Sequence, residues 1–249
     1  MGALAGQRAW ITGGGSGIGA GSAIALAQSG AEVILSGRRA APLEQIAGKI
    51  RNDGGTASVR PLDVADSSAV AKAAEDIGPV NILLANAGLN VPDRSFEKMT
   101  AQGWDKVVDV NLNGVFYAVN GVVPGMRSLG GGLCILIASW AGRYATRLTG
   151  PAYNATKRAV LALSESLNDE EGANGIRSTV IMPGEVATDI LKARPVPPSQ
   201  DDMDRMLQVD DLARTVRFVA EAPPHVCLNE ILISPTWNRF YQGFSEARR

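Results

Sequence analysis

Thr12-Gly13-Gly14-Gly15-Ser16-Gly17-Ile18-Gly19 lies between the apolar run Arg8–Thr12 and a stretch with helical apolar spacing, Gly17–Ser29. This order predicts a strand, a tight turn and a helix. Glycines at such a turn permit a sharp bend and let the backbone approach a pyrophosphate at the helix N-terminus, although glycine-rich turns also occur without a ligand. We expect the dinucleotide contacts of this segment at Gly13, Gly15, Ser16, Gly17, Ile18 and Gly19.

The alternation of apolar strand and helix continues along the whole chain. Expected strands are Arg8–Thr12, Val33–Leu35, Thr56–Leu62, Ile82–Ala85, Leu133–Ala138, Ile176–Met182 and Glu230–Ile233. Expected helices are Gly17–Ser29, Ala41–Asn52, Ser67–Ile77, Gln102–Val123, Pro151–Glu171 and Asp210–Ala222. This pattern predicts an α/β fold with one doubly wound parallel sheet of about seven strands and helices on both faces. We expect residues 1–249 to form a single domain.

One long stretch, Pro183–Gln208, departs from the alternation. It contains Pro195, Pro197 and Pro198, which disfavour a helix. We interpret residues 184–208 as a lid over a substrate site.

Composition narrows the class of protein. With 24 basic and 25 acidic residues among 249, no overall charge favours nucleic acid or an anionic membrane as a partner. No apolar run approaches the ~20 residues that span a bilayer. Cys134 and Cys227 each lie between apolar neighbours, which indicates buried thiols rather than disulfides or a metal site. A cytoplasmic protein without a metal is the expectation.

The end of the second strand bears on which dinucleotide is bound. An NAD site usually has an acidic residue here, but the chain reads Ser36-Gly37-Arg38-Arg39. Arginine can pair with a 2′-phosphate, so Arg38 and Arg39 favour NADP(H), with NAD(H) as the alternative; they could also be solvated loop residues. Asp63, followed by Val64, could contact the adenine or simply form a turn.

Tyr153 and Lys157 are four residues apart in an expected helix, so their side chains share one face. A nearby ammonium stabilises a phenolate, which would make this pair a usable acid–base. Ser139 follows the strand Leu133–Ala138 at the edge where open α/β sheets bind ligands, and its hydroxyl could donate to a carbonyl oxygen. Each pattern alone is also compatible with an ordinary amphipathic helix or turn.

Two asparagines extend this set. Asn111 falls inside the expected helix Gln102–Val123, where asparagine is not favoured, which indicates a polar role. Asn86-Ala87-Gly88 ends the fourth strand, where it could fix the sheet or border a ribose.

In this order and spacing, these segments resemble the short-chain dehydrogenase/reductase family, whose fold is of the Rossmann type. The resemblance rests on Thr12–Gly19, Asn86–Gly88, Asn111, Ser139, Tyr153, Lys157 and Pro183-Gly184, and covers nearly the whole chain. It implies hydride transfer between NADP(H) and a carbonyl compound or alcohol. By the same resemblance, Tyr153 exchanges the proton, Ser139 positions the oxygen, Lys157 lowers the pKa of Tyr153 and holds the ribose, and Asn111 anchors a water.

The resemblance also implies further contacts and an assembly. Pro183, Gly184, Val186 and Thr188 match the segment that contacts the nicotinamide. The C-terminal Ser234-Pro235-Thr236 departs from the Asp-Gly-Gly common in tetrameric members, so of homodimer and homotetramer the dimer is favoured.

Two other functions are compatible with parts of this sequence. The alternative is a catalytically silent cofactor-binding sensor of the same fold. A serine hydrolase would need a histidine beside Ser139, and the only one, His225, lies before the last strand. A partly basic substrate pocket is suggested by Asn90, Arg94, Arg143 and Arg147. We hypothesise that Arg143 or Arg147 binds an anionic group, unless both lie in a solvated loop.

Overall fold

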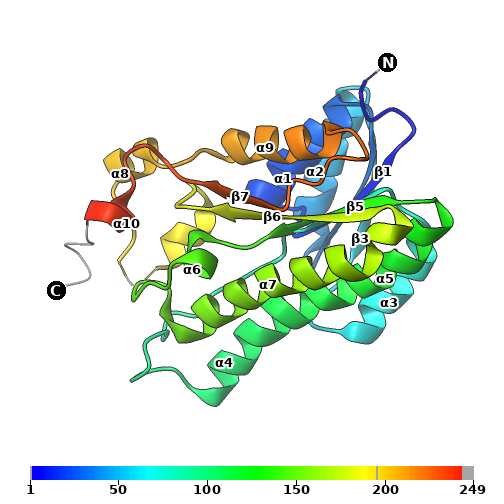
Figure 1. Ribbon diagram of the computed structural model, residues 1–249. Coiled ribbons are helices and arrows are strands. Elements are labelled where there is room, and N and C mark those ends of the chain that lie inside the picture. Colours follow the sequence, from blue (N-terminus) through cyan, green and yellow to red (C-terminus); the bar gives the residue numbers. More distant parts are fainter. Residues whose placement is uncertain (1, 195, 243–249) are drawn as a thin grey trace.

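Seven strands form one parallel sheet in the order β3-β2-β1-β4-β5-β6-β7 (Figure 1). The computed structural model describes residues 2–194 and 196–242. The strands are β1 (Arg8–Thr12), β2 (Glu32–Gly37), β3 (Thr56–Pro61), β4 (Ile82–Ala85), β5 (Gly132–Ile137), β6 (Ile176–Pro183) and β7 (Glu230–Ile233). The chain reverses its direction of winding between β1 and β4, which makes their carboxyl ends the expected ligand crevice. The predicted fold class is confirmed.

Helices cover both faces of this sheet (Figure 1). One face carries α1 (Gly17–Gln28), α2 (Ala40–Asn52) and α9 (Val209–Glu221). The other carries α3 (Ser67–Ile77), α5 (Gly114–Ser128) and α7 (Gly150–Glu171). Among the described residues, no helix is long and apolar enough to cross a membrane.

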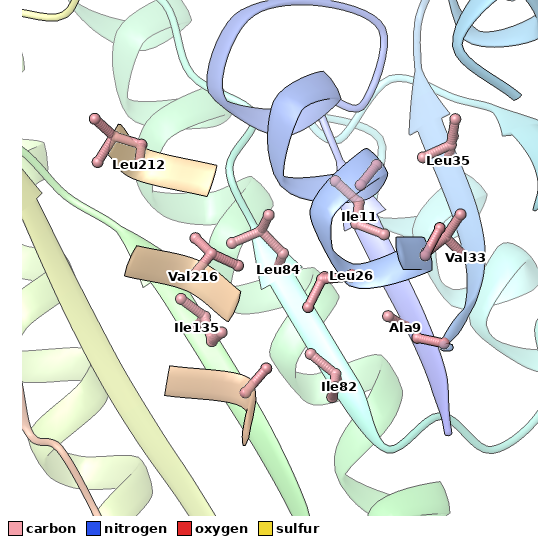
Figure 2. Close-up of a cluster of buried hydrophobic side chains, with 14 of the residues drawn as sticks. Ala9, Ile11, Leu26, Val33, Leu35, Ile82, Leu84, Ile135, Leu212 and Val216 are labelled. Carbon is pink, nitrogen blue, oxygen red and sulfur yellow. The ribbon is translucent and has the colours of Figure 1, made fainter. Parts of the chain in front are cut away.

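Side-chain alternation along the strands builds two separate cores. In β1, Ala9 and Ile11 point to the core beneath α1 and α9, where they lie near Leu26 and Val216 (Figure 2). Trp10 points to the opposite core, beneath α3, α5 and α7. Both faces of the central strands are therefore buried, which explains their continuously apolar sequence.

The expected helix Gln102–Val123 has the right position but is not continuous. It consists of α4 (Ala101–Val108), the π-helical turn η1 (Asp109–Asn113) and α5. A π-turn inserts one residue into the helical ladder and is frequent at functional sites. Here it contains the buried Asn111.

The expectation that helix is disfavoured in Pro183–Gln208 is wrong for two parts of this segment. The 3₁₀ turn η3 (Asp189–Ala193) and the helix α8 (Gln200–Arg205) lie within it. Ser199 begins α8 in a capping box with Asp202, and Pro197 and Pro198 precede this cap, where they interrupt no helical hydrogen bond. Pro195 lies outside the described residues.

Three further short elements were not predicted, because a single turn has too few residues for a periodic pattern. They are α6 (Trp140–Arg143), η2 (Gly172–Asn174) and α10 (Arg239–Gln242).

Cys134 is buried as predicted, whereas Cys227 is exposed, so the prediction of a buried thiol from apolar neighbours is wrong for Cys227.

Candidate active site

The glycine turn between β1 and α1 is fixed to the end of β4. Gly13 has φ +67°, and a Cβ atom there would lie 2.8 Å from the Asn86 amide nitrogen. That nitrogen donates to the carbonyl oxygens of Thr12 and Gly13, 3.2 Å from each. The Thr12 hydroxyl also accepts from the backbone of Asn86 at 3.0 Å. Asn86 therefore holds the turn in the shape that glycine permits, as the sheet-fixing interpretation proposed.

A cavity of about 290 Å³ lies at the carboxyl ends of β1, β4, β5 and β6. Its wall contains fourteen of the predicted site residues: Gly13, Ser16, Gly17, Ile18, Asn86, Ala87, Gly88, Ser139, Tyr153, Lys157, Pro183, Gly184, Val186 and Thr188. Thr188 faces the glycine turn, since a Cβ atom at Gly17 would lie 3.3 Å from its methyl group. The cavity thus joins the predicted dinucleotide contacts to the predicted acid–base group.

Tyr153 and Lys157 come from α7 and meet Ser139, which caps α6 directly after β5. The Lys157 ammonium donates to the carbonyl of Ile137 at 2.7 Å and lies 5.7 Å from the centre of the Tyr153 ring. The Ser139 hydroxyl accepts from the backbone N–H of Ala141 at 3.2 Å. All three side chains border the same cavity, as their spacing predicted.

Burial sets the protonation of this group. Burial lowers the pKa of Lys157 to about 8, because an ammonium is costly away from water. Burial raises the pKa of Tyr153, and this is opposed by its hydrogen bond with Ser139 and by the positive charges of Arg194 and Arg94. The cations that act on Tyr153 therefore include two arginines, Arg194 and Arg94, that the sequence did not assign to its chemistry.

Asn111 holds the loop after β4. Its side-chain oxygen accepts from the N–H of Leu89 at 2.8 Å, and its amide nitrogen donates to the Leu89 carbonyl at 2.9 Å. A Cβ atom at Gly88 would lie 3.4 Å from both the Asn111 oxygen and the Lys157 nitrogen. Asn111 is thus close to the catalytic candidates through Gly88, although its own side chain does not line the cavity.

Six predicted cofactor contacts lie outside the cavity wall: Gly15, Gly19, Arg38, Arg39, Asp63 and Val64. A Cβ atom at Gly15 would approach Pro42 of α2, and Gly19 packs against the Gly13 carbonyl. Arg38 and Arg39 are exposed after β2. Asp63 accepts from the N–H of Ala65 at 3.1 Å, which forms a turn, and Val64 is buried.

The basic residues of the cavity are not those of our hypothesis. Arg143 and Arg147 are exposed and do not line the cavity, and Arg143 lies 3.7 Å from Glu230. The prediction that one of them faces the site is wrong, because both side chains are exposed outside the cavity wall. Arg94, which the sequence suggested for a partly basic pocket, does line the cavity, and so does Arg194, which it did not suggest.

The remaining wall residues could not be identified from the sequence. Glu185, Arg194 and Phe240 reach the cavity from the segment after β6 and from α10. Phe240 stacks on Trp140 with 5.7 Å between ring centres. No local sequence pattern predicts these contacts, since Phe240 and Trp140, for example, are about 100 residues apart in the sequence.

Comparison with known proteins adds independent information. A family model described as short chain dehydrogenase matches residues 7–197. The chain is 33% identical to an uncharacterized oxidoreductase of Staphylococcus saprophyticus over 237 residues, which cover 91% of this chain and 94% of that protein. It is 35% identical over 243 residues to the glycine betaine reductase ATRR of Emericella nidulans. That match covers 94% of this chain but only 19% of the larger fungal protein.

A solved structure gives the same result for the fold. The X-ray structure of an alcohol dehydrogenase from the archaeon Thermococcus sibiricus, complexed with 5-hydroxy-NADP, aligns with a TM-score of 0.84 at 27% identity. The alignment covers 94% of this chain and 98% of that one.

Proposed function

The chain belongs to the short-chain dehydrogenase family and is an NAD(P)-dependent oxidoreductase, and we propose that it interconverts a carbonyl compound and a secondary alcohol with NADP(H) as its preferred cofactor. The observation that carries the proposal is the single cavity in which Ser139, Tyr153 and Lys157 meet the glycine turn.

The cavity has the features that a nicotinamide dinucleotide needs. The turn Gly13–Gly19 presents backbone N–H groups at the start of α1, where phosphate charge is favoured, and Gly13 and Gly17 have positive φ. Pro183, Gly184, Val186 and Thr188 would hold the nicotinamide end, and Asp63 with Val64 would border the adenine. When bound, the dinucleotide supplies or accepts the hydride.

The preference for NADP(H) rests on Arg38 and Arg39. They are exposed directly after β2, where an acidic residue would otherwise select NAD(H). The Thermococcus sibiricus enzyme, complexed with an NADP derivative, supports this assignment. Use of NAD(H) is the alternative.

The proton transfer belongs to Tyr153. Its hydroxyl would protonate a carbonyl oxygen in reduction and take the proton back in oxidation, while the Ser139 hydroxyl would position that oxygen. Lys157 supports the phenolate and binds the ribose, and Asn111, by fixing Leu89 and the loop after β4, keeps space beside Lys157 for a proton-carrying water.

Substrate access and assembly complete the proposal. Residues 184–208 form a lid on the single domain 1–249; within this lid, Val186, Ile190 and Leu191 line the cavity.

The exposed aromatic side chains of Trp104 and Phe116 on α4 and α5 favour a homodimer through these helices and α7, with a homotetramer as the alternative.

The competing function is a cofactor-binding sensor without catalysis. Such a protein needs no acid–base group beside its ligand, whereas Tyr153, Lys157 and Ser139 here line the same cavity as the glycine turn. This observation favours the enzyme.

The test is a panel of carbonyl compounds and alcohols followed by absorbance of the nicotinamide, with NADPH and NADH in parallel. We expect turnover with a higher kcat/KM for NADPH. Arg38→Ala should reduce this preference at least tenfold, whereas Arg214→Ala, an exposed arginine of α9, should leave it unchanged. Equal use of both cofactors by the unmodified protein would contradict the NADP(H) assignment, and cofactor binding without turnover would favour the sensor.

A further inference from the structure

The guanidinium of Arg94 lines the active-site cavity without a hydrogen-bonding partner. Its Nε is buried and makes no hydrogen bond within the described part of the chain. Nor does any carboxylate among residues 2–194 and 196–242 form an ion pair with it. A buried cationic donor that is left unpaired is costly, so its presence calls for a partner that the folded chain does not itself supply.

The fold holds Arg94 firmly in this place. A Cβ atom at Gly150, which has φ +76°, would lie only 2.0 Å from the Arg94 carbonyl, so the loop after β4 packs tightly on the start of α7. The Asn90 amide nitrogen adds a hydrogen bond to the carbonyl of Thr149 at 2.9 Å. Arg94 is therefore fixed to the same helix that carries Tyr153, three residues beyond Gly150.

A second arginine reaches the cavity from the segment after β6. Arg194 forms an ion pair with the buried carboxylate of Glu185, which also binds Arg239 at 2.8 Å and 2.9 Å. Arg239 contacts Asp202 of α8 at 3.0 Å as well. Glu185 thus serves two guanidinium groups at once and leaves Arg194 with donors to spare.

The charges around the cavity favour an anion. Arg94, Arg194 and Lys157 face it together with two carboxylates, Glu185 and Asp189. Glu185 is engaged by its arginines, and Asp189 has a partner of its own. Of the two arginines in the cavity wall, Arg94 is consequently the one whose charge is left for a ligand.

We propose that the substrate carries a carboxylate, bound by Arg94 with Arg194 beside it, and that this anion lies a short distance from the carbonyl or alcohol carbon that reacts at Tyr153. The proposal rests on the proposed function, since it names the substrate class of the same site. A forked guanidinium binds a carboxylate through paired, charge-assisted hydrogen bonds, which explains the arginine at this position. Arg94 packs on Gly150, three residues before Tyr153, and both arginines line the cavity with Tyr153, so the anion lies near the reacting group, as in a 2-oxo or 3-oxo acid.

The test compares carboxylates with neutral analogues of the same shape. Acetoacetate, 2-oxobutanoate and benzoylformate are each assayed beside their methyl esters with NADPH. We expect at least one acid to be reduced with a kcat/KM at least tenfold above that of its ester. Arg94→Met should lower kcat/KM for that acid at least tenfold and for the ester less than threefold, and Arg94→Lys should restore part of the loss.

Arg147→Met is the matched control, because Arg147 lies in the loop just before the active-site helix α7 but is exposed outside the cavity. This substitution should change kcat/KM for neither the acid nor the ester. Esters reduced as well as their acids, or an Arg94→Met variant that loses both activities equally while its melting temperature is unchanged, would overturn the proposal.

A binding measurement separates this inference from the proposed function. Phenylacetate and phenylacetamide are titrated into the NADPH complex by calorimetry, so no turnover is needed. We expect the carboxylate to bind at least tenfold more tightly, and Arg94→Met to abolish the difference. Such discrimination without turnover of any carbonyl would contradict the proposed function alone, whereas equal binding of acid and amide would overturn the inference even if neutral ketones are reduced.

Discussion

Lys157→Met should change how the stability of this protein depends on pH. The lysine side chain is only 3% exposed and donates a hydrogen bond to the Ile137 carbonyl. Burial lowers its pKa from 10.5 to about 8, so between these values the unfolded chain binds more protons than the folded protein. The free energy of unfolding must then rise with pH in this range, and methionine, which has a similar length and no charge, removes that contribution.

The size of the effect follows from the two pKa values. Between pH 7 and pH 9 the folded lysine is on average half protonated, whereas the unfolded lysine stays almost fully protonated. One pKa unit corresponds to about 1.4 kcal/mol, so the half proton of difference makes the unmodified protein gain roughly 1 kcal/mol relative to Lys157→Met over these two pH units. The loss of the hydrogen bond to Ile137 adds a constant offset that does not depend on pH.

Urea denaturation at pH 7, 8 and 9, followed by tryptophan fluorescence, measures this difference for both proteins. Burial raises the pKa of Cys134 to about 12, and its contribution cancels because both proteins contain it. Lys106→Met, at an exposed position of α4, is the matched control and should show no such trend. A difference between the unmodified protein and Lys157→Met that stays constant from pH 7 to pH 9 would refute the argument from burial.

Three further predictions concern other parts of the structure. Trp10→Phe should lower the free energy of unfolding by about 1–3 kcal/mol in urea titrations, because the buried Ser36 hydroxyl would lose the indole N–H that donates to it at 2.8 Å. An unchanged urea midpoint would contradict this prediction. Gly13→Ala should weaken NADPH binding about tenfold in fluorescence titrations, since φ is +67° and the new methyl group would meet the Asn86 amide, and unaltered affinity would show that the turn can relax. An aromatic disulfide reagent should modify one thiol per folded chain, the exposed Cys227, and two in urea, because Cys134 is buried; rapid labelling of both in the folded protein would be inconsistent with the structure.

Much of the fold could be predicted because its signals are local. The strands Arg8–Thr12, Ile82–Ala85 and Glu230–Ile233 have the expected bounds, since each is a short apolar run that ends at turn residues or a change of composition. The π-turn around Asn111 was not foreseen, because it changes one hydrogen-bond step inside a pattern that still reads as helix. Helix α8 was missed because three prolines outweighed the capping box at Ser199.

The residues of the candidate site differ in the same way: those that follow a local pattern were predicted, and those that depend on tertiary contacts were predicted only in part. Ser139, Tyr153 and Lys157 were found because each follows a recognisable strand or helix spacing, and the parallel sheet brings such positions to one edge. Of the four residues suggested for a partly basic pocket, Asn90 and Arg94 line the cavity and Arg143 and Arg147 do not, and Arg194 was missed, because charge in a loop says nothing about the direction of the side chain. The place of Arg94 and Arg194 in the wall depends on tertiary contacts, the packing of Gly150 on Arg94 and the ion pair of Arg194 with Glu185.

Tyr153→Phe tests the central claim most directly. The substitution removes one hydroxyl and keeps the ring beside Lys157, so the fold and the dinucleotide cleft should persist. The measurement is kcat for the best carbonyl substrate of the panel, together with the Kd of NADPH from fluorescence titration. The account predicts that turnover is abolished while the Kd stays within about threefold of the unmodified value. Retained turnover in Tyr153→Phe would contradict the assignment of proton transfer to Tyr153.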